Sequence, residues 1–357
     1  MKLNFRIQSL AMYEKVVGST DGGTASLMIR RSRIKASGFI LDPSFTYKVE
    51  LGLTNRDIES TQRGDDTDNP GPILDMVLRW NFAGNWVLGF GQTKLPGNRE
   101  RIVSSANLQF VDRSIVNSKF TTDRDAGFWL SHSTKGDFVV RNTFALTSGE
   151  GKNRNIAKNP NTKDGGLSYS YRLEALPFGL FNKKGEYFQG DLARESRPKL
   201  AIGAAYNFNN NTTRSQGQLG SYFLSDELKD IHTGFIDYVF KYRGFSLTGE
   251  YAIKHANDPI TTDSEELTAK PVYVFKGYGL SSQTSYVFKN NIELAARYSI
   301  LRPHEDIMDL RKNQRDLTFG ISKYIHGHKL KVQADVTHSA YGDQETVVGR
   351  FQIETQF

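Results

Sequence analysis

The chain has 357 residues, of which 24% are charged and 12% are aromatic, with a formal net charge of +7 and no cysteine. The lack of cysteine excludes disulfide frameworks, thiolate metal sites and cysteine nucleophiles. The longest uncharged apolar stretches, such as 200–208, are far shorter than the roughly 20 residues of a membrane-spanning helix. The composition therefore excludes helical membrane proteins, and the mild positive charge permits an anionic partner without requiring one.

Apolar and polar residues alternate with a period of two along the whole chain, which predicts sixteen β-strands. Most have about 9 to 14 residues, enough for a tilted strand to cross a bilayer. The N-terminus has no apolar signal-peptide region and reads directly as a strand, so we expect any export signal to lie outside this sequence. The predicted strands are 3–15, 24–41, 44–56, 73–83, 86–94, 125–134, 137–148, 165–175, 198–209, 231–242, 244–255, 275–288, 291–302, 314–325, 328–340 and 345–357.

Short and long connections alternate between these strands. The short ones carry the Gly, Asn and Asp residues of hairpin turns, at 42–44, 84–85, 135–137, 243–244, 289–291 and 326–328. The long polar ones are 57–72, 94–124, 149–164, 210–230, 256–274 and 303–313. This asymmetry is typical of an outer-membrane barrel with short periplasmic turns and long extracellular loops. One connection, 176–197, places 22 residues where a short turn is expected, and nothing in the sequence explains it.

The faces of the strands support a transmembrane antiparallel barrel, all-β, made of one domain over residues 1–357. In 200–208 and 291–302 one face is apolar, while Glu293 and Arg297 lie on the other. A soluble antiparallel sheet also alternates, but charges recur on the second face of nearly every strand, as expected for a polar lumen inside an apolar wall. Aromatic residues near the strand ends suit membrane-interface girdles, and the last strand ends in Phe357, a frequent terminus of outer-membrane barrels.

The face opposite the apolar one carries more basic than acidic residues. The predicted basic residues of the lumen are Arg6, Arg31, Arg33, Lys35, Lys48, Arg79, Arg141, Arg172, Lys199, Lys241, Lys254, Arg297, Lys331 and Arg350. The acidic ones are Glu50, Asp75, Glu174, Asp237, Glu250, Glu293, Asp316, Asp335 and Glu354. The densest group is Arg31, Arg33 and Lys35, which lie on one face of one strand. A water-filled pore used by anions explains three stacked cations, and pairing with carboxylates such as Glu50 is the alternative.

The third long connection, 94–124, concentrates further cations. A loop of about 30 residues in a compact fold is usually functional, and guanidinium groups bind oxyanions through two hydrogen bonds. Such groups inside the barrel predict an anion-selective constriction, whereas local pairing with Asp112 and Asp123 predicts an ordinary extracellular loop. The cations of this loop are Lys94, Arg99, Arg101, Arg113, Lys119 and Arg124.

The connection 57–72 is acidic, and its run Asp65-Asp66-Thr67-Asp68-Asn69 offers oxygen ligands for Ca²⁺. The rest of a calcium-loop pattern is missing, so a solvated surface loop is the preferred interpretation. We expect no cofactor, and nothing in the sequence indicates a nucleic-acid partner.

Three runs together resemble the phosphate-selective porin O and P family. Residues 89–96 read Gly-Phe-Gly-Gln-Thr-Lys-Leu-Pro, residues 112–114 read Asp-Arg-Ser, and residues 124–127 read Arg-Asp-Ala-Gly. The segment 30–33, Arg-Arg-Ser-Arg, resembles the arginine pair in the second strand of the family. The first 150 residues carry the resemblance, and beyond them it rests on strand spacing and on Phe357.

The resemblance implies a homotrimer of sixteen-stranded barrels in the bacterial outer membrane, each with an arginine ladder leading to a basic constriction. It implies passive diffusion of anions, phosphate among them, along residues that line the pore. Those residues are Arg31, Arg33, Lys35, Lys94, Arg99, Arg101, Arg113, Lys119 and Arg124.

Two other functions remain open on the sequence. A barrel whose lumen is plugged by the loops 94–124 and 210–230, acting as an accessory subunit of an outer-membrane complex, has the same alternation. A barrel enzyme needs a hydroxyl nucleophile beside a base. His132 and His338 have no Ser partner in a lipase-like motif, and the pair His326 and His328 is incomplete as a metal site, so we do not expect an enzyme.

Overall fold

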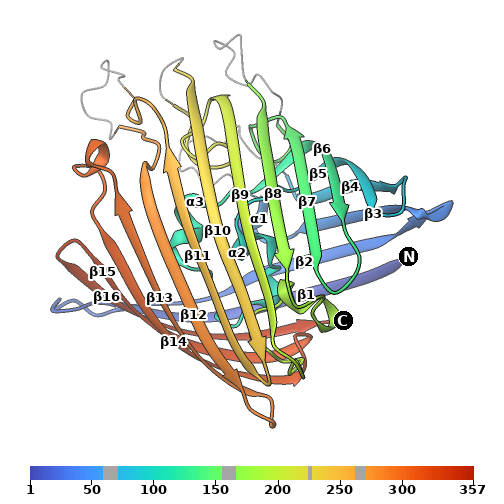
Figure 1. The fold of residues 1–357 in the computed structure, drawn as a ribbon. Coiled ribbons are helices and arrows are strands. Elements are labelled where there is room, and N and C mark those ends of the chain that lie inside the picture. Colours follow the sequence, from blue (N-terminus) through green and yellow to red (C-terminus); the bar gives the residue numbers. More distant parts are fainter. Residues whose placement is uncertain (59–70, 155–165, 224–226, 262–270) are drawn as a thin grey trace.

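The computed structural model describes residues 1–58, 71–154, 166–223, 227–261 and 271–357, and its strands form one closed barrel (Figure 1). Each strand pairs in antiparallel fashion with the next one in the chain, and β1 pairs with β16 to close the sheet. The predicted sixteen-stranded all-β barrel is therefore confirmed. No helix among the described residues is long and apolar enough to cross a membrane.

The strands are β1 (Lys2–Val16), β2 (Thr24–Ile40), β3 (Asp42–Gly52), β4 (Ile73–Asn81), β5 (Trp86–Lys94), β6 (Arg124–Ser133), β7 (Val139–Thr147), β8 (Ser168–Leu176), β9 (Lys199–Thr212), β10 (Lys229–Tyr242), β11 (Phe245–His255), β12 (Gly277–Val287), β13 (Ile292–Pro303), β14 (Gln314–His326), β15 (Leu330–Tyr341) and β16 (Gln344–Gln356). The short helices are α1 (Asn55–Ile58), α2 (Arg99–Ile102), η1 (Ser105–Asn107), α3 (Ile115–Phe120), η2 (Asn182–Tyr187) and η3 (Glu305–Ile307). All sixteen predicted strands are present, and the largest shift is at the end of β3, because α1 follows that strand closely.

The two faces of the wall have the predicted polarity. Ile202 and Leu294 point outward and are about half exposed, at 47% and 50%. Glu293 and Arg297, from the same strand as Leu294, point inward and are 0% and 5% exposed. The wall is therefore apolar outside and charged inside, which is the polarity of a barrel whose solvent is lipid.

The connections divide into two ends, here called the turn end and the loop end. The turn end carries the hairpin turns after β2, β4, β6, β10, β12 and β14, and the loop end carries the long connections. The connection between β15 and β16 is a short turn at the loop end. The connection 177–198 between β8 and β9 is the long exception at the turn end, as the sequence indicated.

Phe357 helps to seal the barrel where its first and last strands meet. The backbone N–H groups of Phe5 and Phe357 each donate to the carbonyl of the other residue, at 2.7 and 3.0 Å. Their rings pack edge to face, with centroids 5.3 Å apart. The terminal aromatic residue therefore continues the ladder beyond β16 and covers the seam.

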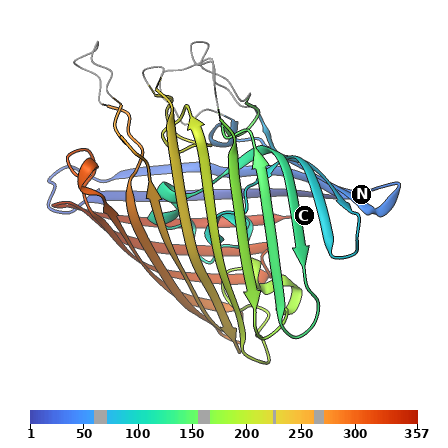
Figure 2. The same ribbon diagram turned by 45° about the horizontal axis from the view of Figure 1, so that its top comes forward.

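Two segments fold into the interior instead of leaving it. One is the connection 95–123, here called the third loop, which contains α2, η1 and α3. The other is the connection 177–198, here called the inner turn, which contains η2. Figure 2 shows the teal coils of the third loop inside the ring of strands. The polar space of the lumen is therefore shared among the wall, the third loop and the inner turn.

Candidate functional site: a basic cavity in the barrel lumen

The third loop turns inward directly after β5. The segment Leu95-Pro96-Gly97 makes this bend, and a β-carbon at Gly97 would lie 1.8 Å from Thr122 Oγ1, so a larger residue would force the Thr122 side chain to move. Ser104 and Ser114 cap the short helices η1 and α3 by accepting hydrogen bonds from the N–H groups of Ala106 and Asn117. The loop therefore has defined local structure before it meets the wall.

Buried ion pairs fix the first half of the third loop to β8, β10 and β11. Arg99 lies against Glu174 and donates to Asp237 at 2.8 Å, and it is 1% exposed. Arg172 donates to the Gly97 carbonyl at 3.0 Å and to the same Asp237 at 2.7 Å. Glu250 accepts from the N–H of residue 100 at 3.0 Å. These contacts hold α2 against one side of the barrel.

The second half of the loop is fixed to β14 and β15. The N–H of Val111 donates to Asp335 at 2.8 Å, and Lys331 donates to the Leu108 carbonyl at 2.8 Å. Gln333 donates to the Gln109 carbonyl at 2.9 Å. The third loop is thus held against β8–β15. It also reaches the other side of the lumen, where Ser105 accepts from Arg6 of β1 at 2.9 Å, but an open space remains along β1–β5.

A cavity of about 1400 Å³ occupies that open side. Eighteen of the side chains that line it belong to Lys or Arg and five belong to Asp or Glu. Lys152, Arg154 and Arg214 contribute from the loop end, and residues 326–329 contribute from the turn end. The cavity therefore spans the lumen between the two ends of the barrel, and its walls are strongly basic.

A β-bulge in β2 adds a cation to the predicted arginine row. Gln8 lies opposite Arg31 while Ser9 lies opposite Ile29, so Arg30 has no residue opposite it in β1. Both Arg30 and Arg31 line the cavity, and they are 6% and 8% exposed. Strict alternation places only Arg31 inside, so the sequence alone could not assign Arg30.

Carboxylates pair with several of these cations. Arg33 donates to Glu50 at 3.1 Å and to Asp57 at 2.6 Å, so the alternative of pairing with Glu50 is confirmed for this arginine. Arg124 and Lys48 share Asp75, at 3.2 and 2.6 Å. These pairs lower the net charge along the wall and fix the geometry of the side chains.

Two carboxylates of the third loop lie among arginines. Asp112 meets Arg30 at 2.6 Å and Arg31 at 3.8 Å. Burial raises the pKa of Asp112, but these two arginines outweigh it and hold that pKa well below its usual range. Arg101 donates to Asp123. Both carboxylates are therefore ionised and neutralise part of the basic surface.

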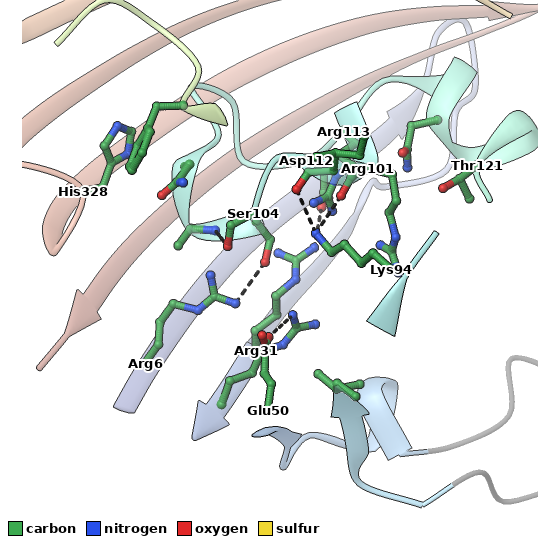
Figure 3. Close-up of a pocket in the computed structure, with 18 of the residues that line it drawn as sticks. Arg6, Arg31, Glu50, Lys94, Arg101, Ser104, Asp112, Arg113, Thr121 and His328 are labelled. Atoms are coloured by element: carbon green, nitrogen blue, oxygen red, sulfur yellow. Dashed lines mark hydrogen bonds and ion pairs between the residues drawn. The ribbon is translucent and has the colours of Figure 1, made fainter. Parts of the chain in front are cut away.

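Two cations of the cavity have carbonyl partners instead of carboxylates among the described residues. Lys94 donates to the Arg101 carbonyl at 2.6 Å, and Arg113 donates to the carbonyls of Glu100 and Val103 at 2.8 and 2.9 Å. Burial, together with the neighbouring Arg101, lowers the pKa of Arg113. Figure 3 shows Lys94, Arg101 and Arg113 converging beside Asp112. A charge buried without a counter-charge is costly, so Lys94 and Arg113 offer a place for an anion.

Seven of the nine predicted site residues line the cavity: Arg31, Arg33, Lys35, Lys94, Arg101, Arg113 and Arg124. The other two, Arg99 and Lys119, lie elsewhere. Arg99 points to the opposite wall, where Asp237 and Glu174 bind it, and the Lys119 carbonyl accepts from Lys254 at 2.8 Å. Side-chain direction in a loop has no period, so the sequence could not separate Arg99 from Arg101.

Lys152 is a further cation of the cavity that the sequence analysis did not single out. It follows β7 at the loop end and donates to the Asp57 carbonyl at 2.9 Å. The possible calcium ligands Asp65, Asp66 and Asp68 lie outside the described residues. Of the histidines considered for catalysis, His132 packs on Trp86 with ring centroids 4.5 Å apart, and His338 lies 3.2 Å from Glu345.

A family model described as phosphate-selective porin O and P matches residues 1–356. The chain belongs to the phosphate-selective porin O and P family. This porin is a β-barrel of the bacterial outer membrane, and both family and fold indicate a channel, not an enzyme. No curated protein sequence matches it.

Solved porin structures share the fold of this porin at low sequence identity. An anion-selective porin from Comamonas acidovorans has a TM-score of 0.61 and 8% identity, over 100% of this chain and 99% of that one. OmpF of Salmonella typhi, in complex with daunomycin, has a TM-score of 0.60 and 12% identity, over 100% and 98%. The trimer form of OmpT of Vibrio cholerae has a TM-score of 0.52 and 11% identity, over 99% of each chain.

Proposed function

We propose that this porin is a passive, anion-preferring diffusion channel, and that inorganic oxyanions such as phosphate are its solutes. The observation that carries the proposal is the cavity, which receives residues from both ends of the barrel and is lined by far more cations than carboxylates. A basic ring in a narrow pore favours anions by replacing part of their hydration shell.

The cations have two roles in this proposal. Arg33 and Arg124, which are paired with Glu50 and Asp75, keep the wall basic without binding an anion tightly. Lys94 and Arg113 donate to carbonyls and have no carboxylate partner among the described residues. Their positive charge is therefore available to bind the anion directly at the constriction. Charge-assisted hydrogen bonds from guanidinium groups suit the oxygens of phosphate, and nearby carboxylates keep binding weak enough for release.

A plugged barrel that serves as an accessory subunit is the second candidate. The third loop and the inner turn both occupy the lumen, and this observation favours it. The two candidates differ in conductance, because a lumen that is open at both ends carries ions and a plugged one does not.

The proposal also covers the assembly of the porin. We infer a single barrel domain, embedded in outer-membrane lipid through its apolar wall, that assembles into a homotrimer without a cofactor. The trimer form described for OmpT, which shares the fold, supports the homotrimer.

Single-channel recording in planar bilayers tests the channel directly. Phosphate is titrated against a chloride current through the wild type, Lys94→Met and Arg113→Gln, with Lys276→Met as a control that removes a cation paired with Asp306 outside the cavity. We expect phosphate to block the current in the wild type and the control, and the block to be lost in both cavity variants. A folded barrel without conductance would favour the accessory subunit.

A further inference from the structure

The inner turn is the segment for which the sequence offered no explanation. It replaces a hairpin turn at the turn end, yet it folds back into the barrel and buries Phe181 in an apolar cluster with Val139, Leu176, Ala201 and Val239. Residues Lys183, Phe188 and Leu192 of this segment line the cavity. The inner turn is therefore part of the wall that an ion passes.

Buried polar contacts hold the inner turn in place. Lys241 of β10 is 2% exposed and donates to the carbonyls of Gly185 and Phe188, both at 2.8 Å, and to that of Gly190. Arg141 of β7 donates to Glu186 at 2.7 Å. A lysine that gives all its hydrogen bonds to one segment fixes the backbone of that segment against the strand.

The inner turn is joined to the third loop. The Gln189 N–H donates to the Asn107 carbonyl at 2.8 Å, and the Gln109 N–H donates to Gln189 Oε1 at 3.0 Å. The Asn107 side chain donates to the Tyr187 carbonyl at 3.1 Å. The two segments thus make one continuous partition, with the cavity on one side of it.

At the turn end, the partition contacts the turn between β14 and β15. The Phe188 ring packs against the ring of His328, which lies between β14 and β15, with centroids 5.3 Å apart. His328 also contacts Tyr324, at 5.1 Å, and Figure 3 shows it at the edge of the cavity. These contacts join the inner turn to the turn between β14 and β15, and Phe188 and His328 line the cavity together at this end.

The chemistry of the inner turn differs from that of the third loop. Its lining residues include one cation, Lys183, and otherwise uncharged side chains or backbone, such as Phe188 and Leu192. The cations that attract anions come from β1–β5 and the third loop. The inner turn therefore takes up space in the passage but adds little positive charge to its walls.

We propose that the inner turn is a second constriction, which limits solute size at the turn end so that inorganic oxyanions pass and phosphorylated sugars do not. This inference rests on the proposed anion channel. The cations of the charged constriction then select for the phosphate group of a solute. The rings of Phe188 and His328 at the turn end exclude a solute whose phosphate group carries a sugar.

The test removes the inner turn and keeps the barrel. In the β8–β9 register Ala175 lies opposite Ile202, so Phe178 and Lys199 can flank a two-residue turn, and Asn-Gly replaces residues 179–198. Phe188→Ala is a milder variant that leaves the segment in place, and Phe178→Ala, at an exposed position of the same segment, is its control. Proteoliposome uptake of inorganic phosphate and of glucose 6-phosphate is measured for each protein.

We expect the wild type and Phe178→Ala to take up phosphate and exclude glucose 6-phosphate. Glucose 6-phosphate uptake rises several-fold in the replacement variant and, to a smaller degree, in Phe188→Ala. The inference is overturned if the wild type already passes glucose 6-phosphate, or if it passes phosphate and both variants still exclude the sugar phosphate. A wild type that is closed to phosphate contradicts the proposed channel itself, and opening on removal of the inner turn would then identify this segment as a complete plug.

Discussion

At the scale of single residues, Asp112 balances part of the basic surface of the cavity. Its carboxylate meets Arg30 at 2.6 Å, Arg31 at 3.8 Å and Arg350 at 3.9 Å. One negative charge therefore faces three cations that come from β2 and β16. This carboxylate belongs to the third loop and lines the cavity. Its charge therefore acts directly on the electrostatic potential of the passage.

Replacement of Asp112 by Asn is expected to make the channel more selective for anions. The side chain keeps its size while the three arginines lose their shared counter-charge, so the potential in the cavity becomes more positive. The reversal potential under a KCl gradient should move toward the chloride potential. Asp306→Asn, at an exposed carboxylate outside the cavity, is the control, and equal shifts in the two variants would contradict this role of Asp112.

Lys152 is expected to give the channel a pH dependence near neutrality. Burial lowers the pKa of Lys152 to about 8, with Asp123 and Asp57 acting against burial and Arg124 and Arg101 acting with it. The side chain is therefore charged below this pH and loses its charge as the pH rises through about 8.

Anion selectivity should accordingly fall as the pH rises from neutral to alkaline, with a midpoint at about 8. Lys152→Arg keeps the charge at alkaline pH and should remove this step from a plot of reversal potential against pH. Lys152→Met should show low selectivity throughout. A step that persists unchanged in both variants would assign the titration to another group.

At the scale of elements, the third loop depends on buried ion pairs with the far wall. Arg99 is the centre of this anchor, because it holds Glu174 and Asp237 together while Arg141 and Arg172 contribute further pairs. An arginine in this position holds the loop and does not meet a passing ion. Its loss should change the motion of the loop and leave selectivity in place.

Arg99→Gln is expected to lower the free energy of unfolding by roughly 3 kcal/mol, since it leaves buried carboxylates with fewer partners. Current traces should show more frequent closures, while the reversal potential stays at the wild-type value. Urea unfolding in detergent measures the first effect and bilayer recording the second. Arg315→Gln, at an exposed position of β14, should change neither quantity. A shifted reversal potential in Arg99→Gln would instead place Arg99 on the anion path.

The strands were predictable from the sequence because each one repeats a two-residue period and ends at a recognisable turn. The candidate site was predictable only in part. The inward direction of Arg31, Arg33 and Lys35 follows from alternation, but the bulge at Arg30 and the turn of Arg99 toward β8 and β10 do not. Both depend on partners far away in the chain, Gln8 opposite the bulge and Asp237 beside Arg99, and no local pattern encodes such pairs.

At the scale of the whole molecule, the apolar wall fixes the barrel in the membrane. Leu294 points outward from β13 and is 50% exposed, whereas its neighbours in the strand point into the lumen. The wall therefore tolerates a change of size at this position better than a charge.

Leu294→Arg should destabilise the barrel by roughly 2–4 kcal/mol if the residue lies near the bilayer midplane. Leu294→Phe is the matched control, because it changes size without adding a charge, and it should be close to neutral. Unfolding in lipid vesicles, followed by tryptophan fluorescence, measures both. A neutral result for Leu294→Arg would show that this face of β13 does not meet lipid.

We infer that the basic cavity along β1–β5 is an open path for anions through the barrel. The most direct measurement is the reversal potential of the purified wild-type porin in a planar bilayer under a KCl gradient. We predict a stable conductance whose reversal potential lies on the chloride side of zero, reduced toward zero in an Arg113→Gln, Lys94→Met double variant. A cation-selective current, or no conductance from a folded barrel, would contradict the claim.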